Sequence, residues 1–185
     1  MSRAVKILRL AARISTKLKA YGIDTVLSGG SCVTIYARGK YVTRDLDFVL
    51  AASYPEKIIA SALAELGYHS NPKVSGAFTN PKEETIIDIR PPPPAIGGEP
   101  IRQPQRIITG GYQLTLLSPT DCVKDRLAHF FFFNDRQGLE QAILVATNQK
   151  VNIREVRRWA EAEGMAERYR EFYRALLRQR RLKSK

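Results

Sequence analysis

The sequence predicts an α/β (α+β) protein whose last third is helical. Short apolar stretches typical of strands recur between residues 23 and 117. Helical spacing of apolar residues separates several of these stretches, and strand-like segments end before residue 118. At 185 residues, the chain has the size of one domain with its own core. We therefore expect two regions, an α/β core at residues 1–117 and a basic helical region at residues 118–185.

The individual elements follow from periodicity and from stop signals. Apolar residues at helical spacing from Ile7 to Leu18 predict a first helix, which Tyr21-Gly22 would end. Ser31 is expected to cap a short helix that reaches about residue 39. Another helix is predicted over residues 56–66. Strands are predicted at residues 23–28, 45–51, 74–79, 84–90, 106–109 and 112–117.

Proline and capping residues mark the boundaries further along the chain. The proline-rich residues 91–105 are expected to form an irregular loop, because proline removes backbone donors and fixes φ. Ser118 followed by Pro119 and Asp121 predicts a helix start. Further helices are expected from Asn134-Asp135 and within residues 152–182. Phe130 to Phe133 are interpreted as core residues, and the two cysteines, Cys32 and Cys122, as buried free thiols.

Basic charge is concentrated at the two ends of the chain. The net charge is +12, from 30 Lys and Arg against 18 Asp and Glu. Residues 1–50 carry a net charge of +6, residues 51–149 of −1 and residues 150–185 of +7. Such a field attracts polyanions such as RNA or DNA. The alternative is a solubilising surface with a frayed basic tail. Truncation after Arg174 is expected to remove basic residues with little core.

The sequence gives no indication of a membrane protein. No unbroken apolar run reaches the roughly 18 residues that a membrane-spanning helix needs. The N-terminus mixes basic and apolar residues too evenly for the apolar core of a signal peptide. We expect a cytoplasmic protein without a membrane partner.

The residues with the clearest chemical meaning are Gly29-Gly30-Ser31 and, after thirteen intervening residues, Asp45-Leu46-Asp47. In a strand, Asp45 and Asp47 share one face, while Leu46 and Phe48 face the core. Two neighbouring carboxylates repel unless a cation holds them. Mg²⁺ binds one or two carboxylates together with substrate phosphates. The glycines leave room for a phosphate, and a helix start at Ser31 would supply donors to it.

This pattern resembles the signature of the DNA polymerase β-type nucleotidyltransferase superfamily. The resemblance implies a mixed sheet flanked by helices and a third carboxylate on a neighbouring strand, for which Asp88 is the candidate. It implies that Asp45, Asp47 and Asp88 hold Mg²⁺, or alternatively Mn²⁺, and that Asp88 deprotonates the attacking hydroxyl. Arg44, between the two motifs, is a candidate contact for the nucleotide or an RNA backbone.

The segment from Leu116 to Ala146 is similar to AbiEii-type and MenT-type bacterial nucleotidyltransferases. The resemblance implies that Lys124 neutralises nucleotide phosphates and that Asp135 supports the site. Two positions depart from the family pattern: Asn134 stands where an arginine is expected, and Gly138 where a second acid is often found. Capping of a helix by Asn134-Asp135 is therefore an equal alternative, and the alternative for Lys124 is a solvated charge on a capped helix.

These observations together predict a metal-dependent nucleotidyltransferase. It would move a nucleoside monophosphate from an NTP to an RNA acceptor, which the MenT resemblance identifies as the tRNA 3′ end in a toxin-like activity. Such an activity implies a possible cognate antitoxin protein as partner. One alternative is a minimal nucleotidyltransferase antitoxin that AMPylates a partner protein. The other is an RNA-binding module whose carboxylates are inactive.

Overall fold

The computed structural model describes residues 2–38 and 40–183. The last two residues of the predicted basic tail, Ser184 and Lys185, lie outside the described part. A mixed seven-stranded sheet with the order β3-β4-β5-β2-β1-β9-β8 forms the centre of the N-terminal part. Its strands are β1 (Thr25–Ser28), β2 (Asp45–Leu50), β3 (His69–Ser70), β4 (Ala77–Asn80), β5 (Glu83–Arg90), β8 (Gln105–Thr109) and β9 (Tyr112–Leu116).

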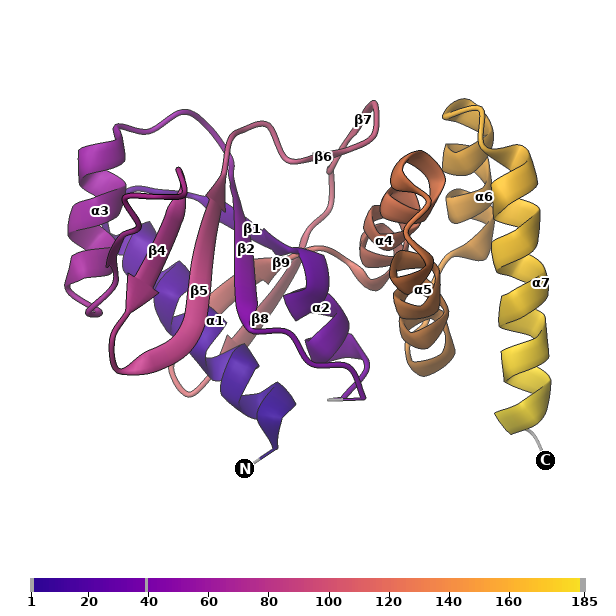
Figure 1. Ribbon diagram of the computed structural model, residues 1–185, viewed down its shortest axis with the longest axis horizontal. Helices are drawn as coiled ribbons and strands as arrows, with labels where there is room; N and C mark the ends of the chain where they lie inside the picture. Colours follow the sequence, from indigo (N-terminus) through magenta and orange to yellow (C-terminus); the bar gives the residue numbers. More distant parts are fainter. Residues whose placement is uncertain (1, 39, 184–185) are drawn as a thin grey trace.

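Two of the neighbouring strand pairs are parallel, β1 with β9 and β2 with β5. Three helices pack with the sheet: α1 (Arg3–Ala20), α2 (Gly29–Tyr36) and α3 (Glu56–Ala64). Four more helices follow the last strand, α4 (Pro119–Phe133), α5 (Arg136–Asn148), α6 (Ile153–Ala162) and α7 (Ala166–Lys183). Figure 1 shows these four gathered beside the sheet. The predicted fold class, a mixed sheet flanked by helices with a helical C-terminal region, is confirmed.

The predicted helix start at Ser118 is confirmed in detail. The Ser118 hydroxyl accepts from the backbone N–H of Asp121 at 3.1 Å, and Pro119 occupies the first helical position. The predicted loop at 91–105 is corrected in one respect. It contains a short hairpin, β6 (Ala95–Ile96) with β7 (Glu99–Pro100), which reaches towards the C-terminal helices (Figure 1).

Strand alternation places apolar side chains of the central strands in the core. Leu46 and Phe48 of β2 and Ile87 of β5 are fully buried. The phenylalanine run is only half in the core: Phe130 and Phe131 are buried, whereas Phe132 and Phe133 are exposed. Four consecutive helical residues cannot share one face, so two of them point outward. Cys32 and Cys122 are buried free thiols, as predicted.

The prediction of a frayed tail is wrong within the described residues. Helix α7 continues to Lys183 and buries Leu176 completely. Arg180 Nη2 donates to the carbonyl oxygen of Ala146 at 3.0 Å, which ties the last turns to α5. Truncation after Arg174 would therefore remove part of the core. Among the described residues, no helix has the length and apolar character needed to cross a membrane.

Candidate active site

The two strands β2 and β5 bring Asp47 and Asp88 together. The strands are parallel and their register pairs Asp47 directly with Asp88. Since neighbouring residues in register point to the same face of a sheet, both carboxylates project together. Asp45 lies on the same face but is more exposed, and its backbone N–H donates to Thr43 Oγ1 at 3.2 Å. The sheet thus joins one acid of the predicted Asp45-x-Asp47 pair to the predicted third acid.

Arg90 bridges these two carboxylates from the end of β5. Its Nη2 lies 3.1 Å from Asp47 Oδ1 and 3.2 Å from Asp88 Oδ2. Burial raises the pKa of Asp47 above its usual range; the hydrogen bond and charge of Arg90 oppose that rise, and the Asp88 charge reinforces it. A cation between two carboxylates relieves their repulsion. Arg90 was not among the residues predicted from the sequence, although its position two residues after Asp88 on the same strand was a usable signal.

Gly29 lies against the Asp47 carboxylate at the start of α2. Its φ is +65°, and a Cβ built there would lie 2.3 Å from Asp47 Oδ2. Both the backbone conformation and the close approach require glycine at this position. The backbone amides of Gly29, Gly30 and Ser31 belong to the first turn of α2, where N–H groups have no helical partner. A group with anionic oxygens can therefore meet these amides beside Asp47.

The predicted capping role of Ser31 is wrong. Helix α2 begins at Gly29, with Ser28 at the cap position, so Ser31 lies within the first turn. The Ser31 side chain is buried, and its hydroxyl donates to the carbonyl oxygen of Ser28 at 3.0 Å. The backbone amide of Ser31, rather than its hydroxyl, is therefore the group that belongs to the N–H donors of the first helical turn.

The carboxylate pair has the donor chemistry of a magnesium site. Oxygens from Asp47 and Asp88 already converge on one cationic nitrogen, and hard oxygen donors are the ligands that Mg²⁺ prefers. Within residues 2–38 and 40–183, no group of three or more His, Cys, Asp or Glu is arranged to hold a metal ion. Asp45 is therefore outside the convergent pair in this structure. Its role as a third metal ligand stays a prediction.

Lys124 is neither solvated nor placed among the strand acids. It is buried in α4, and its Nζ lies 3.0 Å from Glu99 Oε1 and 2.8 Å from Glu155 Oε1. Asp121 is the third carboxylate within 4 Å of this ammonium in the described part of the chain. Hydrogen bonds from Arg158, and then from Lys124, lower the pKa of Glu155 to about 2. The solvated alternative for Lys124 is wrong; its ammonium joins the β6–β7 hairpin, α4 and α6.

Arg126 in α4 carries a positive charge that acts on the Asp47 carboxylate. This residue was not predicted from the sequence. The residue is buried and its guanidinium contacts Asp125 Oδ2 from Nε at 2.8 Å and from Nη2 at 2.5 Å. Burial opposes the charged form of Arg126, yet Asp125, Cys122 and Asp47 together raise its pKa. The Arg126 charge in turn lowers the pKa of Asp47. An arginine amid the buried apolar face of α4 was the available signal.

The two remaining predicted residues lie in other surroundings. Arg44 is exposed, with its Nε 3.8 Å from Glu84 Oε2. Asp135 is the N-cap of α5, and its Oδ1 accepts from the backbone N–H of Gln137 at 2.9 Å. The capping alternative for Asp135 is therefore what the structure shows. Gly138 marks a close contact of α5 with α4, since a Cβ there would lie 2.6 Å from the Arg126 carbonyl oxygen.

Comparison with known proteins supports the fold through structure alone. No protein-family model and no curated protein matches the sequence. Solved structures similar to the chain include the following three. An antigenic nucleotidyltransferase-like protein from Paracoccidioides brasiliensis matches with a TM-score of 0.56 at 13% identity, over 76% of this chain and 73% of that one. The fold is the nucleotidyltransferase fold.

The same nucleotidyltransferase fold extends over almost the whole chain in the other two comparisons. The antibiotic-resistance factor ANT(2'')-Ia in solution matches with a TM-score of 0.56 at 12% identity, over 95% of this chain and 96% of that one. A crystal structure of ANT(2'')-Ia with adenylyl-2''-tobramycin matches with a TM-score of 0.55 at 12% identity, over 91% and 99%. The helices α4–α7 are therefore included in the similarity, and not only the sheet.

Proposed function

We propose that this protein is a magnesium-dependent nucleotidyltransferase that transfers a nucleoside monophosphate from an NTP to RNA. The observation that carries the proposal is the in-register pair of Asp47 and Asp88 beside the first turn of α2. The fold that the chain shares with a nucleotidyltransferase-like protein and with ANT(2'')-Ia agrees with such an activity. The AbiEii-type and MenT-type resemblance adds the tRNA 3′ end as acceptor and a toxin-like role, with an antitoxin protein as partner.

The residues of the site divide the chemistry between them. Asp47 and Asp88 would hold Mg²⁺, with Asp45 as a further predicted ligand, and the bound ion would neutralise phosphate charge. The amides of Gly29, Gly30 and Ser31 would bind phosphate oxygens. The acceptor hydroxyl forms a bond to the α-phosphorus, the bond to pyrophosphate breaks, and the hydroxyl proton passes to Asp88. Arg126 adds fixed positive charge near Asp47.

The charge of the chain favours RNA as the acceptor. The net charge is +12, and residues 150–185 contribute +7 of it. Positive charge strengthens the binding of a polyanion such as RNA. Recognition of a tyrosine on a partner protein does not require this charge. Protein AMPylation therefore remains the second candidate function. A small molecule is a further acceptor class, which the adenylyl-2''-tobramycin bound to one similar structure suggests.

The test is transfer of label from each NTP in turn. The protein is incubated with Mg²⁺, total tRNA and one α-labelled NTP, and the labelled product is identified. Label in RNA supports the proposal, label in protein supports AMPylation, and no label with any NTP contradicts both. The Asp47→Asn variant should lose about a hundred- to a thousandfold in rate, the scale of a lost electrostatic stabiliser. Asp24→Asn, at an exposed acid paired with Lys19, is the matched control and should keep its rate.

A further inference from the structure

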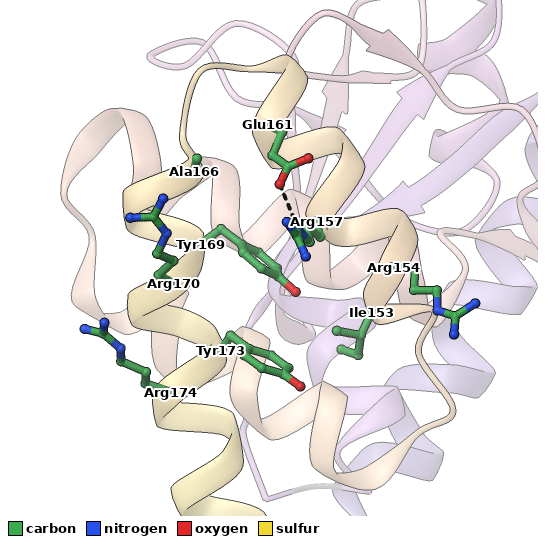
Figure 2. Close-up of a pocket in the computed structure, with 9 residues that line it drawn as sticks. All are labelled: Ile153, Arg154, Arg157, Glu161, Ala166, Tyr169, Arg170, Tyr173 and Arg174. Atoms are coloured by element: carbon green, nitrogen blue, oxygen red, sulfur yellow. Dashed lines mark hydrogen bonds and ion pairs between the residues drawn. The ribbon is translucent and has the colours of Figure 1, made fainter.

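A groove between α6 and α7 is lined by arginine and tyrosine. It encloses a cavity of about 410 Å³, and Figure 2 shows Tyr169 and Tyr173 of α7 and Arg157 of α6 pointing into it, with Arg154, Arg170 and Arg174 extending outward at its margins. The residues that give it its character are Arg154 and Arg157 of α6 together with Tyr169, Arg170, Tyr173 and Arg174 of α7. None of these was assigned to the nucleotidyltransferase site. The groove is thus a second candidate binding surface.

The charge of this groove is strongly positive. Four arginines line it against a single acid, Glu161. Arg157 Nε is paired with Glu161 Oε1 at 2.7 Å, and Arg170 is paired with Glu167. Arg154 and Arg174 are exposed and form no ion pair within the described residues. The groove therefore offers uncompensated guanidinium groups to an anionic ligand.

The two tyrosines add an aromatic surface to this charge. Tyr169 and Tyr173 are stacked, with ring centroids 6.0 Å apart and an interplanar angle of 13°. Tyr169 is buried, whereas Tyr173 is 38% exposed and forms the outer ring of the stack. A partly exposed aromatic ring of this kind can stack on a nucleic acid base.

The basic surface continues along α7 beyond the groove. A neighbouring cavity of about 660 Å³ shares Arg170 and Arg174 and extends to Arg178 and Arg181. These four arginines recur at intervals of three or four residues, so they lie on one side of the helix. From the first to the last they span about 16 Å along the helix axis. A stripe of this length matches the extended phosphate backbone of a nucleic acid strand better than a compact anion.

We propose that this groove binds a single-stranded segment of RNA, with phosphates on the arginines and one base on Tyr173. That the RNA is also the acceptor rests on the proposed function. A second copy of this chain is disfavoured as occupant, because two such grooves would oppose like charges. Charge complementarity together with a stacking ring favours a nucleic acid strand over a protein.

The groove is separate from the carboxylate site. Helix α6 packs on α4 and helix α7 packs on α5, so α4 and α5 stand between the groove and the sheet (Figure 1). The bound segment is therefore a part of the RNA away from its reacting end. Substitutions in the groove should weaken RNA binding and leave the binding of NTP unchanged.

The experiment measures binding of a fluorescein-labelled single-stranded RNA by anisotropy over a series of salt concentrations. The charge variant is Arg154→Ala/Arg174→Ala, and its control, Lys57→Ala/Lys73→Ala, removes two exposed charges of the N-terminal part, one in α3 and one between β3 and β4. The stacking variant is Tyr173→Leu, and Tyr173→Phe keeps the ring. Circular dichroism and thermal unfolding of each variant establish that it is folded.

The charge variant should bind more weakly, and its salt slope should fall by about 1.4 for two lost phosphate contacts on a single strand. Tyr173→Leu should bind about 5- to 150-fold more weakly, and Tyr173→Phe should bind like the wild type. Equal slopes for the charge variant and its control, or equal affinity of Tyr173→Leu and Tyr173→Phe, would overturn the proposal. A concentration-dependent dimer that Arg174→Glu abolishes, with RNA binding unchanged, would overturn it in favour of a second copy.

Binding and chemistry fail separately in this design. If the wild type transfers no nucleotide but the groove variants lose RNA binding, the groove proposal stands and the enzymatic proposal falls. If transfer to RNA occurs with the same KM for RNA in the groove variants, the enzymatic proposal stands and the groove proposal falls.

Discussion

At Arg90, one guanidinium nitrogen contacts the oxygens that would bind the metal. A Mg²⁺ ion lies about 2.1 Å from its ligand oxygens, so it would compete with Arg90 for Asp47 and Asp88. The Arg90 side chain is 56% exposed and has room to turn outward. We expect Arg90→Ala to lower the Mg²⁺ concentration for half-maximal thermal stabilisation by about two- to fivefold, the scale of an exposed ion pair. Arg106→Ala is the control; unchanged or weaker Mg²⁺ binding by Arg90→Ala would contradict competition.

The raised pKa of Asp47 has a consequence for stability without metal. The folded state holds this proton more tightly than the unfolded state does, because burial disfavours the charged form. Its contribution to stability is full below the unfolded pKa of about 3.9 and is lost as pH rises through the raised folded pKa. Asp47→Asn should remove that part of the pH dependence. Urea unfolding at a series of pH values measures it, and parallel pH profiles for wild type and variant would rule it out.

Residue-level prediction succeeded where it followed from strand alternation. The placement of Asp45 and Asp47 opposite Leu46 follows from the two-residue repeat of a strand, and the structure has it. The same repeat places Arg90 on the face of Asp88, but the contacts of the cations with Asp47 could not be predicted from it. Arg90 contacts both carboxylates through its side-chain conformation, and the charge of Arg126 acts on Asp47 only through the position of α4 in the fold. Neither conformation nor docking is encoded in a local repeat.

Among the elements, α4, α6 and the β6–β7 hairpin meet at Lys124. The structure gives this ammonium two close carboxylates, so Lys124→Met should lower the free energy of unfolding by about 1.5–3 kcal/mol, the range for hydrogen bonds to charged groups. The rate of transfer should change by less than about tenfold, below the loss expected for a phosphate-binding lysine. Urea unfolding and initial rates measure the two effects, with exposed Lys150→Met as control. A larger loss of rate at unchanged stability would restore the phosphate role.

Element boundaries were predictable where a capping residue sets them. Ser118 and Asp135 both accept hydrogen bonds from the first turns of their helices. The start of α2 was missed because Gly29 adopts a φ of +65° and enters the helix before Ser31. Gly138 could not be interpreted from sequence either. Its contact with the Arg126 carbonyl leaves no room for the acid often found there, and only the α4–α5 packing reveals this.

For the whole molecule, α7 belongs to the fold although its composition suggested a tail. Deleting residues after Arg174 removes Leu176, which is fully buried. We expect a loss of about 2–5 kcal/mol in the free energy of unfolding, as for a large core side chain. Deletion after Gln179 keeps Leu176 and should cost much less. Urea unfolding of the two truncations decides the point, and equal stability of both would contradict a core role for this part of α7.

The β6–β7 hairpin links the two candidate binding surfaces mechanically. It follows the strand that carries Asp88 and Arg90 along the chain, and its Ile96 carbonyl accepts from Trp159 Nε1 of α6 at 3.2 Å. Glu99 of the same hairpin contacts Lys124 and Arg158. If binding of RNA shifts α6, these contacts offer a route from α6 to the hairpin that follows the strand of the acids. Thermodynamic linkage then makes the effect mutual: the factor by which RNA changes the affinity for NTP equals the factor by which NTP changes the affinity for RNA.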